Sequence, residues 1–308
     1  MKGTGNANIH PAFAGFSEVV PLSGLSGAHV ALLRTPAGHR FVRKAGSDAA
    51  TSVVLRKQAR RQIWLKSAVA GSANVPEVIA EGETEGLYYF DMPFIASRDA
   101  ASLLATATFE EVADFAGRIE VLMTTLAGAD PELGEPRPPS KNALLGKLDE
   151  IVLRTNGRFS EALEPLRRAA AQLDTLGVSR PTAVHGDLTF ENILVSSKGQ
   201  LWLIDAIESP FDHYWIDWSK LFQECEGRWH LHRGRPISTS VTWWLRNRLL
   251  RAASALASDY PSRHYILLGL TFARILPYAV SENDSTYVAG KVLAYGNAAL
   301  AASKAGLK

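Results

Sequence analysis

The sequence has little of three things. Its 308 residues include a single cysteine, Cys225, so no intrachain disulfide can form. The net charge is only +2, which gives no field for attracting nucleic acid or a membrane surface, and we expect neither as a partner. No stretch reaches about 18 apolar residues, and residues 1–16 lack the apolar core of a signal peptide. We therefore expect a soluble, cytoplasmic protein.

Two regions of the chain differ in their hydrophobic pattern. Strands are predicted at 28–35, 39–45 and, as a pair, within 75–95, with one helix at 51–70. Helices are predicted at about 108–128, 142–175, 240–258, 262–281 and 286–304. The pattern predicts an α+β fold: an N-lobe (1–95) with a small antiparallel sheet and one helix, a hinge near 92–97, and a larger, mostly helical C-lobe (96–308).

A short polar island, "AVHGDLTFENILV" (183–195), interrupts the helical region and is followed by "LWLIDAIES" (201–209). If the apolar runs of the two segments pair as a hairpin, Asn192 and Asp205 stand side by side at the strand ends. One amide and one carboxylate suit Mg²⁺, which completes its shell with water and phosphate oxygens. Asp187, on the preceding loop, could then accept a proton from a substrate hydroxyl, which is the constellation of phosphoryl transfer. An ordinary Asp-rich turn is the alternative interpretation.

The motif H-G-D-x-x-x-x-N, followed by an apolar residue, Ile and Asp, resembles the signature of the aminoglycoside phosphotransferase and choline kinase superfamily. The resemblance implies a two-lobed, protein-kinase-like fold and a small-molecule kinase that uses ATP and Mg²⁺. It implies that Asp187 is the catalytic base, that Asn192 and Asp205 bind Mg²⁺, and that His185 and Asp217 are structural supports of the catalytic loop.

The N-terminal region supplies candidates for binding the nucleotide phosphates. A phosphate loop fits "PLSGLSGAHVAL", where Ser23, Gly24, Ser26 and Gly27 lie between strand-like segments, and a plain hairpin turn is the alternative. The apolar-x-Lys pattern of the superfamily favours Lys44 as the phosphate-binding lysine. Arg43 is the competing cation, but strand alternation puts residues 43 and 44 on opposite faces. A solvent-facing Lys44 is the remaining alternative.

One position departs from the resemblance. Protein-kinase-like folds pair this lysine with a Glu on the next helix, whereas the expected position holds Gln58, which supplies a hydrogen bond without charge. In "LYYFDMPFIAS" the resemblance places Met92 at the back of the adenine pocket. Pro93 then offers its C=O group, and Ile95 its N–H group, to the adenine ring.

The segment after Asp205 begins acidic and turns basic around interleaved tryptophans. We expect contacts to the acceptor from Glu208, Asp212, Arg228 and Trp229, with Asp212 also competing weakly with Asp217 for the bracing position. Trp faces suit sugar rings and Arg suits carboxylate or phosphate, so we expect a neutral or anionic sugar-like acceptor. The alternative is a core role for the tryptophans and a solvated basic loop. The wider pattern also resembles bacterial phosphotransferases found near capsule and surface-polysaccharide genes.

Three rival functions remain open. An aminoglycoside antibiotic phosphotransferase would need an acidic acceptor site, because its substrates carry several ammonium groups. A protein Ser/Thr kinase should carry D-F-G and A-P-E segments, but "IDAIESP" replaces the first and no A-P-E follows. A nucleotide-binding pseudokinase scaffold usually lacks the base, a metal ligand or the lysine, and all of these positions are filled here.

Overall fold

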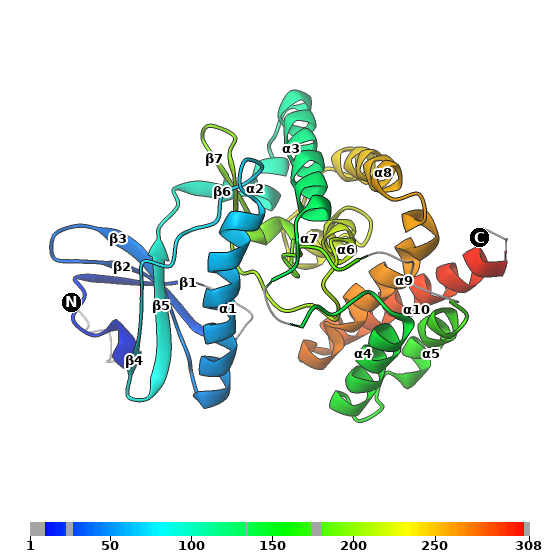
Figure 1. The fold of residues 1–308 in the computed structure, drawn as a ribbon, viewed down its shortest axis with the longest axis horizontal. Helices are drawn as coiled ribbons and strands as arrows, with labels where there is room; N and C mark the ends of the chain where they lie inside the picture. The colour runs from blue at the N-terminus through cyan, green and yellow to red at the C-terminus, as the bar shows by residue number, and fades with distance from the viewer. Residues whose placement is uncertain (1–9, 23–26, 133–134, 174–179, 305–308) are drawn as a thin grey trace.

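A five-stranded antiparallel sheet with helix α1 forms the smaller of two lobes, and the remaining helices form the larger (Figure 1). The computed structural model describes residues 10–22, 27–132, 135–173 and 180–304. The predicted two-lobed α+β fold is confirmed. The sheet has the order β1-β2-β3-β5-β4, with β1 Glu18–Leu22, β2 His29–Arg34, β3 Arg40–Ala45, β4 Ala80–Thr84 and β5 Leu87–Pro93.

The two faces of this sheet bury different apolar clusters. One face packs Ala31, Leu33, Phe41 and Ala45 against the short helical turn Pro11–Phe13. The other packs Val42, Tyr88, Phe90 and Met92 against Leu55 and Ala59 of α1 (Ala49–Ala68). Because side chains alternate along a strand, Arg43 belongs to the first face and Lys44 to the second, next to α1.

A second sheet in the larger lobe positions the polar island. It has three strands in the order β6-β7-β8, with β6 Ser97–Asp99, β7 Ile193–Ser196 and β8 Leu201–Leu203. The predicted hairpin is confirmed, and Ile193 pairs with Leu203. The strand β6 was not predicted, because three residues are too few to show an alternating pattern. The predicted lobe boundary falls between Pro93, which ends β5, and Ser97, which begins β6.

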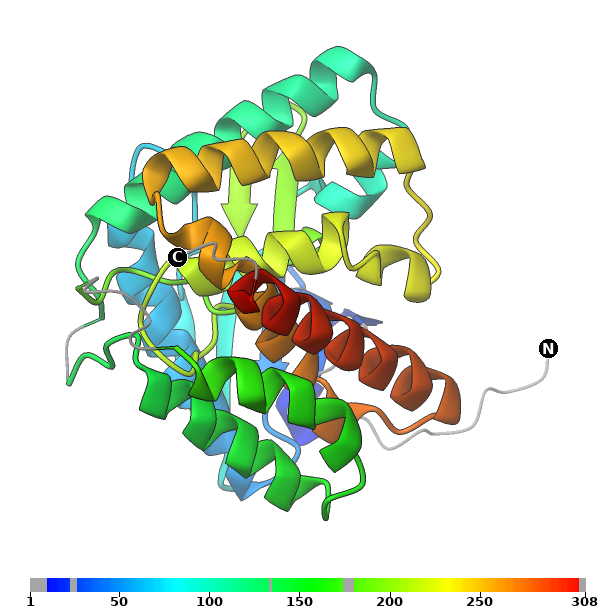
Figure 2. The ribbon, with the colours of Figure 1, turned by 90° about the vertical axis from the view of Figure 1, so that its right-hand side faces the viewer.

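Helices make up the rest of the larger lobe. Their bounds are α2 Ala100–Leu104, α3 Phe109–Gly128, α4 Lys141–Arg154, α5 Ser160–Ala171, α6 Trp215–Cys225, α7 Trp229–His232, α8 Thr239–Leu256, α9 Tyr260–Ala273 and α10 Glu282–Lys304. The capping box of Thr108 and Glu111 starts α3 as predicted. The long α10 packs against α5 and α9 (Figure 2). In the part of the chain described, no helix is long and apolar enough to cross a membrane.

Two predicted helices were wrong in extent, and α6 was missed. The helix predicted over 262–281 ends at Ala273, and a short 3-10 turn, Leu276–Tyr278, follows it. The single helix predicted over 142–175 is two helices, α4 and α5, because Asn156 and Gly157 adopt φ angles of +48° and +72°. Such left-handed conformations end a right-handed helix. The helix α6 was not predicted, and all eleven of its residues are buried. Its polar residues Asp217, Lys220 and Glu224 recur at helical spacing, but they do not face solvent.

Candidate active site

Buried Asp217 in α6 holds the loop that carries Asp187. Its Oδ2 accepts the N–H of His185 at 2.7 Å, and its Oδ1 accepts the N–H of Gly186 at 2.9 Å. Burial raises the pKa of Asp217 to about 7, against the opposing effect of these two N–H groups. Gly186 has φ of +88°, and a Cβ there would collide with the carbonyl oxygen of Ile207. Glycine is therefore required at this turn.

His185 links the two segments that carry the site's carboxylates. Its Nε2 lies 2.9 Å from the carbonyl oxygen of Ile204, and its Nδ1 lies 3.2 Å from the N–H of Asp187. This pattern requires a neutral ring that donates from Nε2 and accepts at Nδ1. Burial lowers the pKa of His185 to about 4, which keeps the ring neutral at pH 7. The imidazole thereby joins the loop of Asp187 to the end of β8, next to Asp205.

The carboxylate of Asp187 has a partner on each oxygen. Asn192 Nδ2 donates to Asp187 Oδ2 at 2.9 Å and to its carbonyl oxygen at 2.8 Å. Lys220 Nζ, from α6, lies 2.9 Å from Oδ1. Burial pushes the pKa of Asp187 up, but the charge and hydrogen bond of Lys220, followed by the charge of Arg274, lower it below its usual value. Asp187 is therefore ionised at neutral pH.

Asn192 and Asp205 stand together at one end of the β7–β8 hairpin. The N–H of Ile204 donates to the carbonyl oxygen of Asn192 at 3.1 Å, which aligns the two residues. Asn192 uses its amide N–H groups on Asp187, and its Oδ1 accepts no hydrogen bond from the described residues. In the described chain, no cluster of three His, Cys, Asp or Glu could hold a metal. This donor set fits Mg²⁺, which takes most of its ligands from water and phosphate.

Lys44 reaches this hairpin from the smaller lobe. It is 3% exposed, and its Nζ forms an ion pair with Asp205 Oδ1. Gln58 of α1 offers its Oε1 to the same ammonium at 3.4 Å. On the opposite face of β3, Arg43 makes two bonds to Asp91, of 2.7 and 2.8 Å, and stacks on the ring of Tyr89.

The segment predicted to hold adenine follows β5. Met92 is buried beside Gln62, whose Nε2 donates to the carbonyl oxygen of Pro76 at 2.8 Å. Pro93 ends the strand, and the N–H of Ile95 donates to no atom of the described residues. Of the predicted phosphate loop, Gly27 precedes β2 with φ of +73°, whereas Ser23, Gly24 and Ser26 lie outside the described residues.

The four residues predicted to contact the acceptor have other partners in the structure. Glu208 Oε1 lies 3.3 Å from Lys57 Nζ, and the buried Asp212 forms an ion pair with Arg137 at 3.0 Å. The exposed Arg228 donates a hydrogen bond to Thr239 at 3.4 Å. Trp229 is buried against the rings of Phe272, Tyr287 and His232. The structure shows no hydrogen bond or ion pair between any of these four side chains and Asp187.

Sequence reasoning missed three cations that surround the Asp187 loop. Lys220 contacts Asp187 itself. Arg274, at the end of α9, approaches the carbonyl oxygen of Gly186 at 3.5 Å. Arg61 in α1 is 3% exposed and donates to the carbonyl oxygen of Val184 at 2.7 Å, which ties α1 to the loop. Lys220 had a usable signal, since it follows Asp217 by three residues and shares its helix face.

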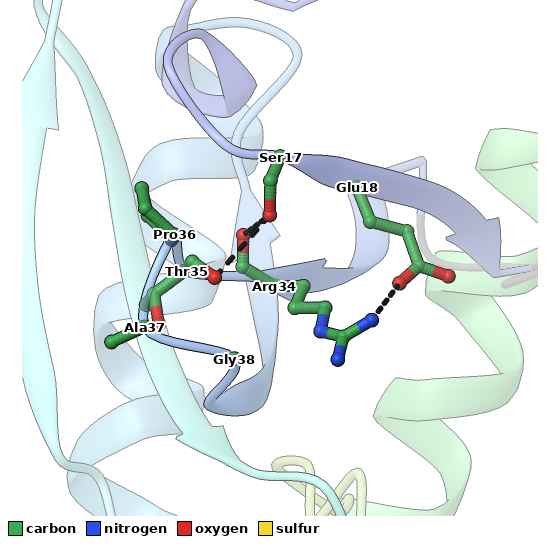
Figure 3. A pocket seen from close by; sticks show the side chains of 7 residues that line it. All are labelled: Ser17, Glu18, Arg34, Thr35, Pro36, Ala37 and Gly38. Carbon is green, nitrogen blue, oxygen red and sulfur yellow. Dashed lines mark hydrogen bonds and ion pairs between the residues drawn. The ribbon is translucent and has the colours of Figure 1, made fainter.

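A separate surface pocket lies at the β2–β3 turn (Figure 3). It has a volume of about 540 Å³ and is lined by Ser17, Glu18 and residues 34–38. Ser17 Oγ donates to the carbonyl oxygen of Arg34 at 3.0 Å, so the lining is held by local bonds. The pocket contains none of the residues predicted to bind nucleotide, metal or acceptor.

Comparison with known proteins gives a family and a fold. A family model described as the phosphotransferase enzyme family matches residues 18–205. A macrolide 2'-phosphotransferase type I is 15% identical with a TM-score of 0.61, covering 91% of this chain and 93% of that one. An aminoglycoside 2'-phosphotransferase-IIIa in a GDP complex is 14% identical with a TM-score of 0.62, and the match covers 95% of this chain and 94% of that one. A fructosamine-3-kinase from Thermobifida fusca, described as putative, is 16% identical with a TM-score of 0.55, and the match covers 93% of this chain and 94% of that one. No curated protein sequence matches the chain.

Proposed function

Because the chain belongs to the phosphotransferase enzyme family, we propose that it transfers the γ-phosphate of ATP to a hydroxyl group of a small, sugar-like metabolite. The observation that carries this proposal is the convergence of Lys44, Asp187, Asn192 and Asp205 on one end of the β7–β8 hairpin. Lys44 comes from the smaller lobe and the other three from the larger, so bound nucleotide would lie between them.

In the proposed reaction Asp187 is the general base. The acceptor hydroxyl gives its proton to the Asp187 carboxylate as its oxygen bonds to the γ-phosphorus. The bond between the γ-phosphorus and the β–γ bridging oxygen breaks, and ADP leaves with that electron pair. Asp187 suits the role because it is ionised and because Asn192 and Lys220 fix its orientation.

The nucleotide contacts follow from the positions of the remaining residues. Lys44 would pair with the α- and β-phosphates, with Gln58 as its neutral tether. Met92 would lie behind the adenine ring, Pro93 would offer its C=O group, and the free N–H of Ile95 would donate to a ring nitrogen. We assign the loop of Ser23, Gly24, Ser26 and Gly27 to the phosphates on the sequence pattern.

Asn192 and Asp205 would hold Mg²⁺, which neutralises charge on the phosphate oxygens. Asn192 Oδ1 accepts no hydrogen bond from the described residues, and Asp205 has one oxygen outside its pair with Lys44. Asp205 adopts φ of +62°, a left-handed conformation that Asp tolerates better than most non-glycine residues. His185 and Asp217 would act by holding the two segments in place.

We keep the acceptor class proposed from the sequence, a neutral or anionic sugar-like compound. Glu208, Asp212, Arg228 and Trp229 stay proposed contacts, and Arg228, the one cation among these four, is exposed. A polycationic aminoglycoside is disfavoured because the structure puts Lys220 and Arg274, both cations, beside Asp187.

A substrate screen tests the proposed function. The protein is incubated with Mg²⁺ and ATP, together with neutral sugars, sugar acids, amino alcohols, kanamycin or a generic protein substrate, and the products are analysed by mass spectrometry. We expect a small hydroxyl compound to gain the mass of one phosphate, and EDTA to abolish the gain. Phosphorylation of the protein substrate alone would support a protein kinase, and ATP binding without turnover would support a pseudokinase.

A further inference from the structure

Lys220 has one hydrogen-bond donor to spare next to the proposed base. It is 7% exposed, and its ammonium contacts Asp187 Oδ1 at 2.9 Å and Gln223 Oε1 at 3.1 Å. An ammonium group has three N–H donors, so one of them donates to no described residue. Burying a lysine costs free energy, and Asp187 offsets only part of that cost. A ligand group with negative charge would complete its coordination.

Arg274 has fewer hydrogen-bond partners than Lys220. This half-buried side chain makes one long contact of 3.5 Å with the carbonyl oxygen of Gly186, and its other N–H groups donate to no atom of the described residues. Its guanidinium lies close enough to Asp187 and Asp217 to interact with both charges. A guanidinium has five N–H donors in a planar fork that matches carboxylate or phosphate. Most of that capacity is unused here.

Both cations reach the Asp187 loop from the side on which we expect the acceptor. The attacking oxygen reaches the γ-phosphorus from the side opposite the leaving ADP. Lys44 of β3 marks the nucleotide side, whereas α6 and α9 lie farther from the five-stranded sheet (Figure 1). Lys220 and Arg274 come from these two elements and reach Asp187 and its loop from the larger lobe.

The other carboxylates of this region have partners of their own. Within the described chain, Glu191 pairs with Arg235, Glu224 accepts the N–H of His230, Glu226 pairs with Arg246 and His264, and Asp284 pairs with His232. Asp187 acts on both cations, Glu224 also acts on Lys220, and Asp217 also acts on Arg274. Asp217 has both oxygens occupied by backbone N–H groups.

We propose that the acceptor carries a carboxylate or phosphate near the hydroxyl that is phosphorylated, and that Lys220 and Arg274 bind this oxyanion. The inference rests on the proposed function and narrows its substrate class. It assigns recognition of the acceptor's negative charge to Lys220 and Arg274, beside the base, instead of to the exposed Arg228.

The test uses sets of compounds that share one sugar ring: glucose, glucuronate, glucose 6-phosphate and glucosamine, each with Mg²⁺ and ATP. Initial rates give kcat/KM for each acceptor, and mass spectrometry identifies the product. We expect an anionic member to exceed glucose by about 10-fold or more, since a charged hydrogen bond contributes on the order of 10- to 100-fold. Glucosamine should be the poorest. Comparison of glucuronate with glucose 6-phosphate distinguishes a carboxylate from a phosphate.

Variants assign the selectivity to the two cations. Arg274→Gln and Lys220→Met should reduce the ratio of anionic to neutral kcat/KM by about 10-fold or more, with Arg274→Gln acting mainly through KM. Lys220→Arg keeps the charge and should keep the ratio. Arg168→Gln, exposed on α5, removes the same charge at a distance and should change nothing.

The outcomes separate the two proposals. If wild type phosphorylates glucose or glucosamine as well as the anionic members, the inference fails and the proposed function stands. If Arg274→Gln lowers anionic and neutral rates equally, Arg274 is only structural and the inference fails. If no hydroxyl compound is phosphorylated, the proposed function fails and the inference fails with it.

Discussion

Two buried lysines, Lys44 and Lys220, each contact a carboxylate of the candidate site, but their partners lie differently. Lys44 pairs with Asp205 across the two lobes, 161 residues apart in sequence. Lys220 pairs with Asp187 inside the larger lobe, 33 residues away, and on an element that packs within the core. The first pair depends on how the two lobes are placed relative to each other, whereas the second lies within the larger lobe.

The difference indicates different tasks. In the proposed reaction Lys44 must exchange Asp205 for nucleotide phosphates, because Asp205 is needed as a metal ligand. In the same proposal Lys220 would keep Asp187 in place throughout and would donate its remaining N–H to the acceptor. The proposal therefore predicts that one lysine changes partner during turnover and the other does not. Variants of the carboxylates and the lysines can separate these two behaviours.

The largest effect should come from Asp187→Asn, which removes the partner of Lys220 and the proposed base together. We expect kcat to fall by about 10²–10⁴-fold, the usual contribution of general-base catalysis. The fold should persist because Asn has nearly the same shape. Steady-state kinetics and circular dichroism measure the two properties, with Glu164→Gln, exposed on α5, as a control for charge loss. A well-folded Asp187→Asn protein with wild-type kcat would exclude Asp187 as the base.

The neighbours Arg43 and Lys44 should give opposite phenotypes. Lys44→Met should lower kcat/KM for ATP by about 10²-fold, since it removes a charge from the phosphates. Arg43→Met leaves Asp91 buried without its partner, which should lower the free energy of unfolding by about 3 kcal/mol but spare activity in the cold. Urea unfolding measures the stability of each variant. Steady-state kinetics with ATP at 10 °C, ~15 °C below standard assay temperature, measure the activity of each variant. Inactivity of a folded Arg43→Met protein would mean that the strand faces have been assigned the wrong way round.

Sequence reasoning worked where function depends on local order. Strand alternation separated Arg43 from Lys44, and the hairpin predicted from two apolar runs brings Asn192 beside Asp205. It failed for Lys220 and Arg274, because their positions depend on how α6 and α9 pack. The polar residues Asp217, Lys220 and Glu224 of α6 recur at helical spacing, but all three are buried, so this pattern does not mark a solvent-exposed helix face.

His185 lies between the two lysine sites, since its ring bonds to the N–H of Asp187 and to the carbonyl oxygen of Ile204, next to Asp205. We expect this histidine to make the free energy of unfolding depend on pH. Its folded pKa of about 4 lies below the ordinary value of 6.5. Between these values the unfolded chain binds a proton that the folded chain does not, so stability falls as the pH falls from 6.5 to 4. The expected loss is about 3 kcal/mol from His185.

Urea unfolding of wild type and His185→Gln across this pH range measures the effect. The variant should be less stable at pH 7, and the difference should shrink as the pH approaches 4. Asp217, with its pKa raised to about 7, acts with the opposite sign, because its folded form gains stability relative to the unfolded chain as the pH falls from 7 to 3.8. Comparing the two proteins cancels that contribution. A constant difference from pH 7 to 4 would show that His185 is not held neutral.

The smallest effect concerns the neutral tether of Lys44. Gln58→Glu would place a carboxylate at the 3.4 Å contact with Lys44 and compete with Asp205 for the ammonium. Because the new charge is paired, we expect an intact fold, unchanged kcat and a change in KM for ATP of about 2- to 5-fold. Gln62→Glu, one turn along α1, is the matched control: Gln62 donates to the carbonyl oxygen of Pro76, and a carboxylate there would face that oxygen. It should therefore lower the melting temperature, whereas Gln58→Glu should not. If Gln58→Glu lowers the melting temperature as much as Gln62→Glu does, Lys44 does not compensate the charge at position 58.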